Sequence, residues 1–399
     1  MTKEFTKILS FAFEHAGDDP LRLLLQQQRY PDIDLRLVAQ QLEGQRQASV
    51  KWPTLARCGG YFYPPRLNRE QSSSEAAARY KAHLFATMGG GALADLTGGM
   101  GVDTYFMAQH ATHADYYEVD GELCAIAEHN FATLGAGNID CHCCDSLGTD
   151  AVLGMYDLIF IDPARRDGQG RKVAAFEDCT PNLLEHLDTL RAKCRHLMVK
   201  ASPMVDIHTA VSQLGSVAEV HVVAVEGECK EVLFVVPGGP MKETGLEPII
   251  HCTDIDKQGA AQEYTFTWAE EAAALPHYAT EAGTYLYEPN AALMKGGCYG
   301  CIGGWFSLEK LARNTHLYTS HQRIENFPGR VFRVVCPLPL NAKEAHRHIP
   351  EGRAHVVVRN YPMAAAELQK KLRLTEGGRL FVVAATLGRQ PQGWLCEMA

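Results

Sequence analysis

An acid, a proline and two arginines form the segment of this sequence best suited to chemistry. Asp162 directly follows a largely apolar run, residues 156–161, and Pro163, Arg165 and Arg166 come after it. A carboxylate at a strand end can accept a hydrogen bond from an amine or take its proton, and arginines bind phosphates and carboxylates through paired hydrogen bonds. The alternative is a loop whose arginines pair with local acids. Because ligands bind at the carboxyl ends of strands in open α/β sheets, we predict that these four residues are catalytic.

A predicted strand and a predicted helix are joined by a glycine-rich segment, Asp95-Leu-Thr97-Gly98-Gly99-Met-Gly101-Val-Asp103. Glycines let the backbone turn tightly and approach a ligand, and the N-terminus of the helix offers N–H groups to it. A purely structural turn can have the same composition. Thr97 replaces the first glycine of the dinucleotide fingerprint, which argues against a dinucleotide ligand.

Acidic residues follow the next two predicted strands. Glu118 ends the second strand, where a carboxylate can accept hydrogen bonds from ribose hydroxyls. Asp120 follows it and has a simpler interpretation as the cap of the next helix. Asp145 and Ser146 follow the third strand, again at a carboxyl end, and Asp145 is as well suited to capping as to ligand binding.

The elements that position these residues alternate between short apolar runs and helical patterns. This alternation predicts an α/β fold with a parallel, doubly wound sheet. Only residues 226–228 join the last two strands, so we expect an antiparallel hairpin at one edge of the sheet. The predicted strands are 92–96, 114–119, 138–143, 156–161, 196–200, 219–225 and 231–236; the helices are 76–87, 102–109, 121–134, around 147–153, 181–192 and 205–214.

Breakers and composition divide the chain into four predicted parts. Residues 1–75 have apolar residues at helical spacing and form a helical cap that offers no chemistry. Residues 76–240 form the α/β domain, which ends at the Pro-Gly-Gly-Pro segment 237–240. Beyond it we predict a small α+β domain over residues 241–320 and a basic domain over residues 321–399.

Charge is distributed unevenly over the 399 residues. The net charge is −9, but residues 1–240 contain 21 Lys+Arg against 31 Asp+Glu, whereas residues 321–389 contain 12 against 5. A uniformly basic nucleic-acid binder is therefore excluded, and a locally basic one is not. The start of the chain has no signal-peptide pattern and no apolar run reaches the length of a membrane span, so we expect a soluble, cytoplasmic protein.

Taken in order, these motifs resemble those of class I S-adenosylmethionine-dependent methyltransferases, over roughly residues 76–236. Residues 127–130, Ala-Glu-His-Asn, and 161–164, Ile-Asp-Pro-Ala, belong to the same resemblance. It implies a Rossmann-like seven-stranded sheet and S-adenosylmethionine as cofactor. The glycine loop would face the methionine part, the acid after the second strand the ribose, and the acid after the third strand the adenine. The implied cofactor-binding residues are Gln71, Ser74, Asp95, Thr97, Gly98, Gly99, Gly101, Asp103, Glu118, Val119, Asp120, Asp145 and Ser146.

The Asp-Pro-Ala-Arg-Arg string more closely resembles a bacterial methyltransferase group with a THUMP-like C-terminal domain, distantly akin to trimethylguanosine synthase. That group has a segment like residues 70–75, Glu-Gln-Ser-Ser-Ser-Glu, which the resemblance places over the cofactor. A helix cap at Ser72 or Ser73 is the other interpretation, and both can hold. Amino-directed nucleic-acid methyltransferases have a second proline and an aromatic residue where this chain has Ala164 and Arg165. Stacking of a flipped base on this loop is therefore not expected.

The fifth predicted strand lacks the nucleophile of another methyltransferase class. Residues 199–203, Val-Lys-Ala-Ser-Pro, occupy the place where 5-methyluridine methyltransferases have a cysteine. Ala201 cannot attack a pyrimidine ring, so we expect direct transfer to a nitrogen, oxygen or sulfur atom. Lys200 either lines the site or is a solvated strand-end lysine.

The 13 cysteines are scattered along the chain and read as reduced thiols. Residues 141–144, Cys-His-Cys-Cys, resemble a metal cluster, but alternate side chains of a strand point to opposite faces. A structural zinc site usually has a second ligand pair at a defined spacing, and the pair Cys298 and Cys301 lies about 155 residues after this segment. We therefore predict no metal site.

Three C-terminal segments also occur in the THUMP-like group: residues 285–295, 327–332 and 359–372. Basic residues near aromatic ones suit RNA, although a solvated helix face is the simpler interpretation. The resemblance favours RNA, rRNA or tRNA, held by the basic domain. We therefore predict an S-adenosylmethionine-dependent RNA methyltransferase. The alternatives are a non-catalytic cofactor- or RNA-binding protein, and a methyltransferase for small molecules or proteins.

Overall fold

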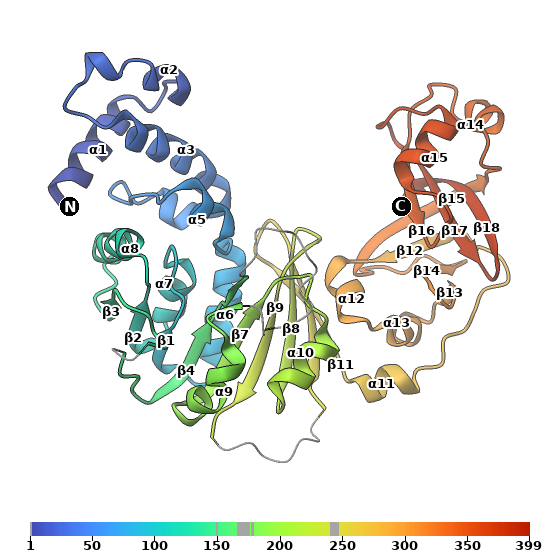
Figure 1. Ribbon diagram of the computed structural model, residues 1–399. Coiled ribbons are helices and arrows are strands. Elements are labelled where there is room, and N and C mark those ends of the chain that lie inside the picture. The colour runs from blue at the N-terminus through green and yellow to red at the C-terminus, as the bar shows by residue number, and fades with distance from the viewer. Residues whose placement is uncertain (1, 149–150, 166–175, 177–178, 240–246) are drawn as a thin grey trace. The chain divides into compact units, whose positions relative to one another are not determined.

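A computed structural model describes residues 2–148, 151–165, 176, 179–239 and 247–399 (Figure 1). The chain divides into two compact units: Met1–Glu219 with Val232–Leu246, and Val220–Glu231 with Glu247–Ala399. The predicted domain boundaries after residues 75, 240 and 320 stay predictions. Within the described residues, the helices are too short or too polar for any of them to cross a membrane.

The first unit begins with a group of short helices, as the apolar periodicity predicts. Asp34 accepts the N–H of Arg36 and caps the longest of them, from which Leu35, Val38 and Leu42 point into a common core. Ile126 of the following α/β region belongs to the same core, so the helices pack directly on that region. They are α1 (Thr2–Glu14), α2 (Pro20–Leu24), the 3-10 helix η1 (Gln27–Arg29), α3 (Leu35–Lys51), α4 (Pro53–Ala56) and α5 (Arg66–Gln71).

The central sheet confirms the predicted α/β fold. Its order is β11-β10-β8-β9-β7-β4-β1-β2-β3, and the pairs β3–β2, β2–β1, β1–β4 and β4–β7 are parallel. Strand β9 is antiparallel to β7. The strands are β1 (Gly91–Asp95), β2 (Ala111–Tyr117), β3 (Ile139–His142), β4 (Tyr156–Ile161), β7 (Cys194–Ala201), β8 (Glu219–Val225) and β9 (Glu228–Pro237); the helices are α6 (Glu75–Thr87), α7 (Val102–Ala108), α8 (Gly121–Thr133), α9 (Leu183–Ala192) and α10 (Ile207–Leu214).

The hairpin of β8 and β9 forms as predicted, but its place at the edge of the sheet was wrong. Glu226 and Gly227, with φ of 54° and 76°, make the two-residue turn that suits the twist of a hairpin. The sheet then continues beyond β8 with β10 (Ile249–Ile255) and β11 (Ala261–Phe266). Both strands come from sequence that we assigned to a separate domain.

The helix predicted around residues 147–153 is also wrong for the described part of that segment. The described residues between β3 and β4 form turns and extended chain. Asp145 accepts the N–H of Leu147 on its side chain and that of Gly148 on its carbonyl, which closes a turn where the helix was expected. Two short strands, β5 (Ala164–Arg165) and β6 (Cys179–Thr180), pair beyond β4.

The second unit contains a seven-stranded sheet with the order β13-β14-β12-β15-β18-β17-β16. Helices α14 and α15 contact each other and bury Ala345, Leu368 and Leu372 against this sheet. The strands are β12 (Tyr285–Pro289), β13 (Glu309–Ala312), β14 (Thr315–Ser320), β15 (Gly329–Pro337), β16 (His355–Arg359), β17 (Leu380–Leu387) and β18 (Gln390–Met398); the helices are α11 (Trp268–Ala273), α12 (Ala291–Gly296), α13 (Tyr299–Phe306), α14 (Ala342–His348) and α15 (Ala365–Leu372).

Candidate active site

A cavity of about 680 Å³ opens at the carboxyl ends of β1, β2 and β4, in the size range of small-molecule sites. It brings together most of the residues predicted to bind the cofactor, together with Asp162. Those that line it are Gln71, Asp95, Thr97, Gly98, Gly99, Gly101, Asp103, Glu118, Val119, Asp120, Asp145, Ser146 and Asp162.

The glycine-rich segment turns tightly between β1 and α7. The backbone is left-handed at Gly99 and Gly101, with φ of 56° and 77°. A Cβ atom on Gly98 would lie 2.0 Å from the ring of Tyr116, whose hydroxyl donates to the Gly99 carbonyl at 2.6 Å. A Cβ atom on Gly101 would lie 2.6 Å from the ring of Phe131. Three glycines are thus required by the fold itself, whatever binds above them.

Glu118 and its neighbours form one wall of the cavity. The carboxylate of Glu118 accepts the N–H groups of Gly99 and Asp120, each at 2.9 Å, so its position is fixed from both sides. Asp120 caps α8 by accepting the N–H of Glu122 at 2.9 Å, which is the simpler of its two interpretations. Val119 lines the cavity and is 75% exposed. An exposed apolar side chain at this place is suited to contact an aromatic ring of a ligand.

Asp145 and Ser146 form the wall beyond β3. Asp145 is exposed, and its side chain accepts the N–H of Leu147 at 3.0 Å. Ser146 is buried and donates to the Leu96 carbonyl at 2.8 Å, which ties this wall to the start of the glycine loop.

The serine segment ahead of α6 was expected either to cover the cofactor or to cap the helix with Ser72 or Ser73, and the structure differs in detail from both. Ser74, and neither Ser72 nor Ser73, is the N-cap of α6, where it accepts the N–H of Ala77 at 3.3 Å. Ser74 does not line the cavity, whereas Ser72, Ser73 and Gln71 do.

Asp162 lies where β4 ends, and two neighbours hold it. Its N–H donates to the Thr97 hydroxyl at 2.7 Å, and its carboxylate accepts a hydrogen bond from Lys200 Nζ at 2.5 Å. Lys200 is nearly buried at the end of β7, so the hypothesis that it lines the site is supported over the solvated alternative. Threonine at position 97 thus gives the loop a hydroxyl that glycine could not supply.

Of the other three residues of the predicted catalytic segment, Pro163 is not among the described residues that line this cavity. Pro163 is buried, and Arg165 belongs to β5, which pairs with β6 at Cys179. Arg166 lies outside the described residues.

Asp103 belongs to a buried cluster of charged and polar side chains that the sequence analysis did not predict. Lys81, fully buried on α6, lies 3.2 Å from one Asp103 oxygen, and Ser73 donates to the other at 2.7 Å. Lys200 Nζ lies 3.8 Å from that second oxygen. Burial alone would raise the pKa of Asp103, but Lys81, Lys200 and the Ser73 hydroxyl together hold it below its ordinary value.

We expect Lys81→Met to destabilise the protein by about 2–3 kcal/mol, because Asp103 would keep Ser73 and Lys200 but lose its buried partner. Urea denaturation measures this difference. Lys257→Met is the matched control, since Lys257 is 75% exposed in its pair with Glu226 and should matter by about 0.5 kcal/mol or less. Equal effects of the two substitutions would contradict a structural role for the cluster.

Asp95 is fully buried below the glycine loop. Burial raises its pKa to about 7, against hydrogen bonds from the Thr104 hydroxyl and the Thr97 N–H that favour the ionised form. Because the folded state then binds this proton more tightly than the unfolded state, its contribution to stability is present at low pH and is lost as the pH rises through about 7.

As the pH rises from 5 to 8, we therefore expect the free energy of unfolding of the wild type to fall by about 3 kcal/mol more than that of Asp95→Asn. The comparison uses urea denaturation of both proteins at each pH, so that all other titrating groups cancel. Parallel pH profiles for the two proteins would show that Asp95 does not titrate in this range.

Cysteines near the site correct one expectation. A disulfide joins Cys124 of α8 to Cys143 after β3, so these two are not the reduced thiols that we predicted. Cys141 and Cys144 are free and do not form a cluster with Cys143. Ala201 ends β7, in agreement with the absence of a cysteine nucleophile there.

Comparisons with known proteins agree with this geometry. Residues 285–328 match a ferredoxin-like domain family, and residues 329–398 match a THUMP domain-like family. Two Mycobacterium tuberculosis proteins, strains CDC 1551 and H37Rv, each called an uncharacterized S-adenosylmethionine-dependent methyltransferase, are 26% identical over 328 residues, 80% of this chain and 83% of theirs. The crystal structure of a candidate methyltransferase from Porphyromonas gingivalis W83 has 28% identity and a TM-score of 0.86, over 100% of this chain and 98% of that one.

The class of protein is therefore an S-adenosylmethionine-dependent methyltransferase. The predicted fold, the enzyme class and the cofactor are confirmed by these relatives. The chain also has a ferredoxin-like and a THUMP-like domain at its C-terminus. The cavity fits such a cofactor chemically, since carboxylates and an exposed valine converge where a positively charged nucleoside would lie.

Several residues of the cavity were missed at the sequence level. Asn68, Asn182, Glu185 and His186 line it from α5 and from the start of α9. Their positions depend on how these helices pack on the sheet, which no local pattern encodes. Lys81, which lies in the charge cluster beneath the cavity, had one signal in the sequence. It is the one lysine of an alanine-rich helix whose apolar residues predict burial.

Proposed function

We propose that this protein transfers the methyl group of S-adenosylmethionine to an N–H-bearing atom of an RNA, without a covalent cysteine intermediate. The observation that carries the proposal is the position of Asp162, which lines the cavity and whose backbone N–H donates to the Thr97 hydroxyl of the glycine loop. An acceptor group placed beside Asp162 would therefore also be beside the loop.

The cofactor would bind along the cavity wall. The glycine loop and Asp95 would contact its methionine part, Glu118 its ribose, and Val119 with Asp145 its adenine. Bound there, S-adenosylmethionine supplies an electrophilic methyl group on a sulfonium ion. The carboxylates would favour this cation over a neutral product by simple electrostatics.

The Lys200 contact determines what Asp162 can do. Lys200 Nζ donates to one carboxylate oxygen of Asp162 at 2.5 Å, and the other oxygen has lone pairs left that can accept a further hydrogen bond. Asp162 is therefore suited to orient an N–H group, such as an exocyclic amine, and to attract its proton as the methyl group arrives. It is poorly suited to hold a phosphate or a carboxylate.

The charges around the cavity also argue against phosphate binding there. Residues 82–164 contain twelve Asp and Glu and no Lys or Arg. Such a surface repels the RNA backbone, so phosphates must be bound elsewhere in the chain.

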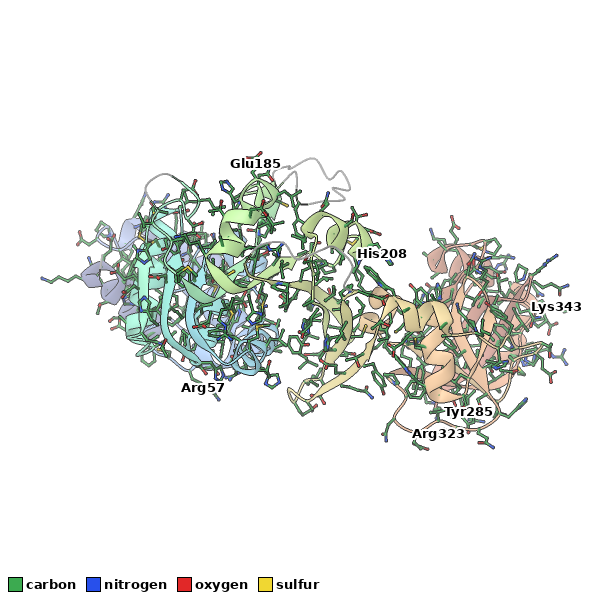
Figure 2. All side chains as sticks on the ribbon, turned by 90° about the horizontal axis from the view of Figure 1, so that it is seen from below. Arg57, Glu185, His208, Tyr285, Arg323 and Lys343 are labelled. Atoms are coloured by element: carbon green, nitrogen blue, oxygen red, sulfur yellow. A yellow bond between two sulfur atoms is a disulfide. The ribbon has the colours of Figure 1, made fainter. Side chains whose placement is uncertain are left out.

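The THUMP-like region offers the cations that this would need. Arg330 and Arg359 pair with Glu288, and Arg333 pairs with Glu397, so these three are partly neutralised. Lys343 on α14 points away from the fold (Figure 2). Exposed cations on α14 and α15 and in the loops of this region support RNA binding; they are Lys343, Arg347, Arg353, Lys370, Lys371, Arg373, Arg379 and Arg389.

The test supplies S-adenosylmethionine with a labelled methyl group to the enzyme and to RNA, protein and small molecules from a strain that lacks it. We expect label in RNA, on a base amino group. Label only in small molecules or only in protein would favour the other kinds of methyltransferase. Cofactor binding by calorimetry without any labelled product would favour a non-catalytic binding protein.

A further inference from the structure

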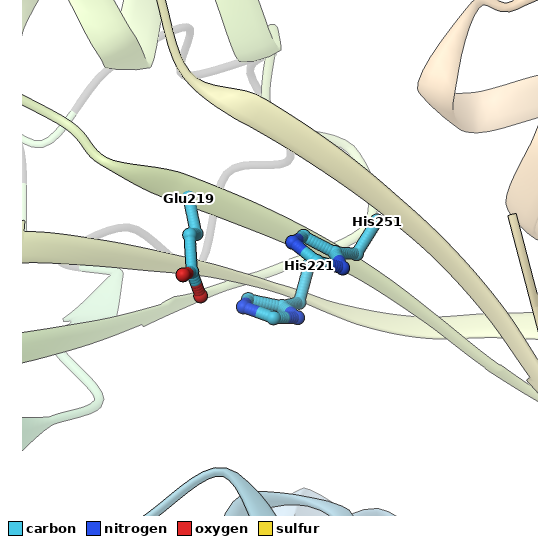
Figure 3. Close-up of side chains that lie close together, drawn as sticks. All are labelled: Glu219, His221 and His251. Carbon is cyan, nitrogen blue, oxygen red and sulfur yellow. The ribbon is translucent and has the colours of Figure 1, made fainter. Parts of the chain in front are cut away.

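Two histidines and a glutamate, Glu219, His221 and His251, lie together on the strands β8 and β10, outside the candidate active site (Figure 3). Glu263 of β11 lies beside His251. Glu219 and His221 are alternate residues of β8, so they share a face of the sheet. His251 comes from β10, the hydrogen-bonded neighbour of β8. His221, His251 and Glu263 belong to the second unit, and Glu219 adjoins it on the same strand.

The two imidazole rings are stacked, with centroids 4.4 Å apart and planes 15° apart. His221 is 1% exposed, and Glu219 and His251 are half-buried. One ligand atom of each of Glu219, His221 and His251 lies within 4.8 Å of the others. Zinc bonds of about 2 Å place ligand atoms roughly 3.3 Å apart, so small side-chain rotations would close this set around an ion.

Glu263 supplies the second observation. Its carboxylate lies 3.2 Å from His251 Nδ1 and also accepts the Thr253 hydroxyl at 2.8 Å. This contact holds the proton of His251 on Nδ1 and leaves Nε2 with its lone pair. In the described part of the chain that buried Nε2 atom has no hydrogen-bond partner. A carboxylate behind a histidine whose other nitrogen is unsatisfied is the arrangement found around metal-bound histidines.

We propose that Glu219, His221 and His251 bind a zinc ion, with Glu263 orienting His251. Two imidazoles and one carboxylate suit zinc better than magnesium or calcium, which prefer oxygen ligands. The ion would fasten β10 to β8. The sequence analysis, which predicts no metal site, did not consider this set, because His221 and His251 are 30 residues apart and meet only through strand pairing.

The contrasting cluster is His113, Asp115 and Asp140. His113 is 45% exposed, and Asp115 already accepts hydrogen bonds from His142 and Tyr156 at 2.6 and 2.7 Å. Its histidine is partly exposed and its Asp115 already has two hydrogen-bond donors, so this group serves as the control.

The test uses the full chain, freed of metal with a chelator and titrated with zinc against a chromophoric chelator. We expect the wild type and His113→Ala to bind one more zinc equivalent than His251→Gln or His221→Asn. Glu263→Gln should bind that zinc about 10–100-fold more weakly. Zinc should raise the melting temperature of the wild type but not of His251→Gln.

Cobalt separates this site from the cysteines, since a nitrogen and oxygen site lacks the sulfur-to-metal charge-transfer band of a thiolate site. Equal zinc stoichiometry in the wild type and His251→Gln, or a cobalt spectrum of thiolates alone, would overturn the proposal. Circular dichroism checks folding, and the half-buried Glu219 provides Glu219→Gln as a further variant should His221→Asn not fold. The readout is metal binding, so its failure leaves the proposed methyl transfer untouched.

Discussion

Asp162→Asn should lower methyl transfer by about 10²–10⁴-fold and leave cofactor affinity nearly unchanged. Asparagine keeps the size and the backbone N–H that donates to Thr97, but it removes the charge that would attract the proton of the acceptor. Single-turnover transfer of a labelled methyl group measures the first quantity, and calorimetry with S-adenosylmethionine measures the second.

Lys200→Met is the companion variant, because it leaves Asp162 in place without its ammonium partner. We expect a smaller loss of rate than in Asp162→Asn, because the carboxylate that accepts the hydrogen bond remains and only the group that holds it in place is lost. Full activity of Asp162→Asn would remove this residue from catalysis. Loss of cofactor binding in that variant would assign it to the cofactor site instead.

Reversing three exposed charges of the THUMP-like region should weaken RNA binding by about 10²-fold without affecting the cofactor. The variant is Lys343→Glu with Lys370→Glu and Lys371→Glu, all on the neighbouring helices α14 and α15. Each cation that contacts a phosphate contributes a counterion term, so the dependence of affinity on salt should also become shallower, by about one unit of log–log slope per contact.

The matched control reverses three exposed arginines of the first unit, Arg22, Arg29 and Arg57, which changes the net charge equally. If this control weakens RNA binding as much as the lysine variant, the effect is one of total charge. If neither variant changes RNA methylation, the THUMP-like region does not bind the substrate.

Local sequence patterns predicted the parts of the fold that depend on local physics. Strand β4 was predicted with its observed bounds because a short, largely apolar run ends at the polar Asp162 and the breaker Pro163. The glycine loop was found because the left-handed backbone at Gly99 and Gly101 restricts the residue type. The cofactor roles proposed for individual residues stay predictions.

The misses arise from contacts between distant segments. Turn chemistry at Asp145 overrode a weak helical pattern, and β10 joined the sheet although a strong boundary signal precedes it. The buried Lys81 needs its partner Asp103, 22 residues later, before its burial makes sense. Pairing of Cys124 with Cys143 likewise depends on where α8 packs against β3.

The hydrogen bond from the Asp162 N–H to the Thr97 hydroxyl has a thermodynamic consequence. It joins the loop that would bind the cofactor to the segment that would receive the acceptor. A ligand that orders one of these segments should therefore also order the other. Binding of the two ligands should then be cooperative, and reciprocity requires each to tighten the other by the same factor. The demethylated cofactor would share this coupling, so we expect it to leave more slowly while a methylated RNA is still bound.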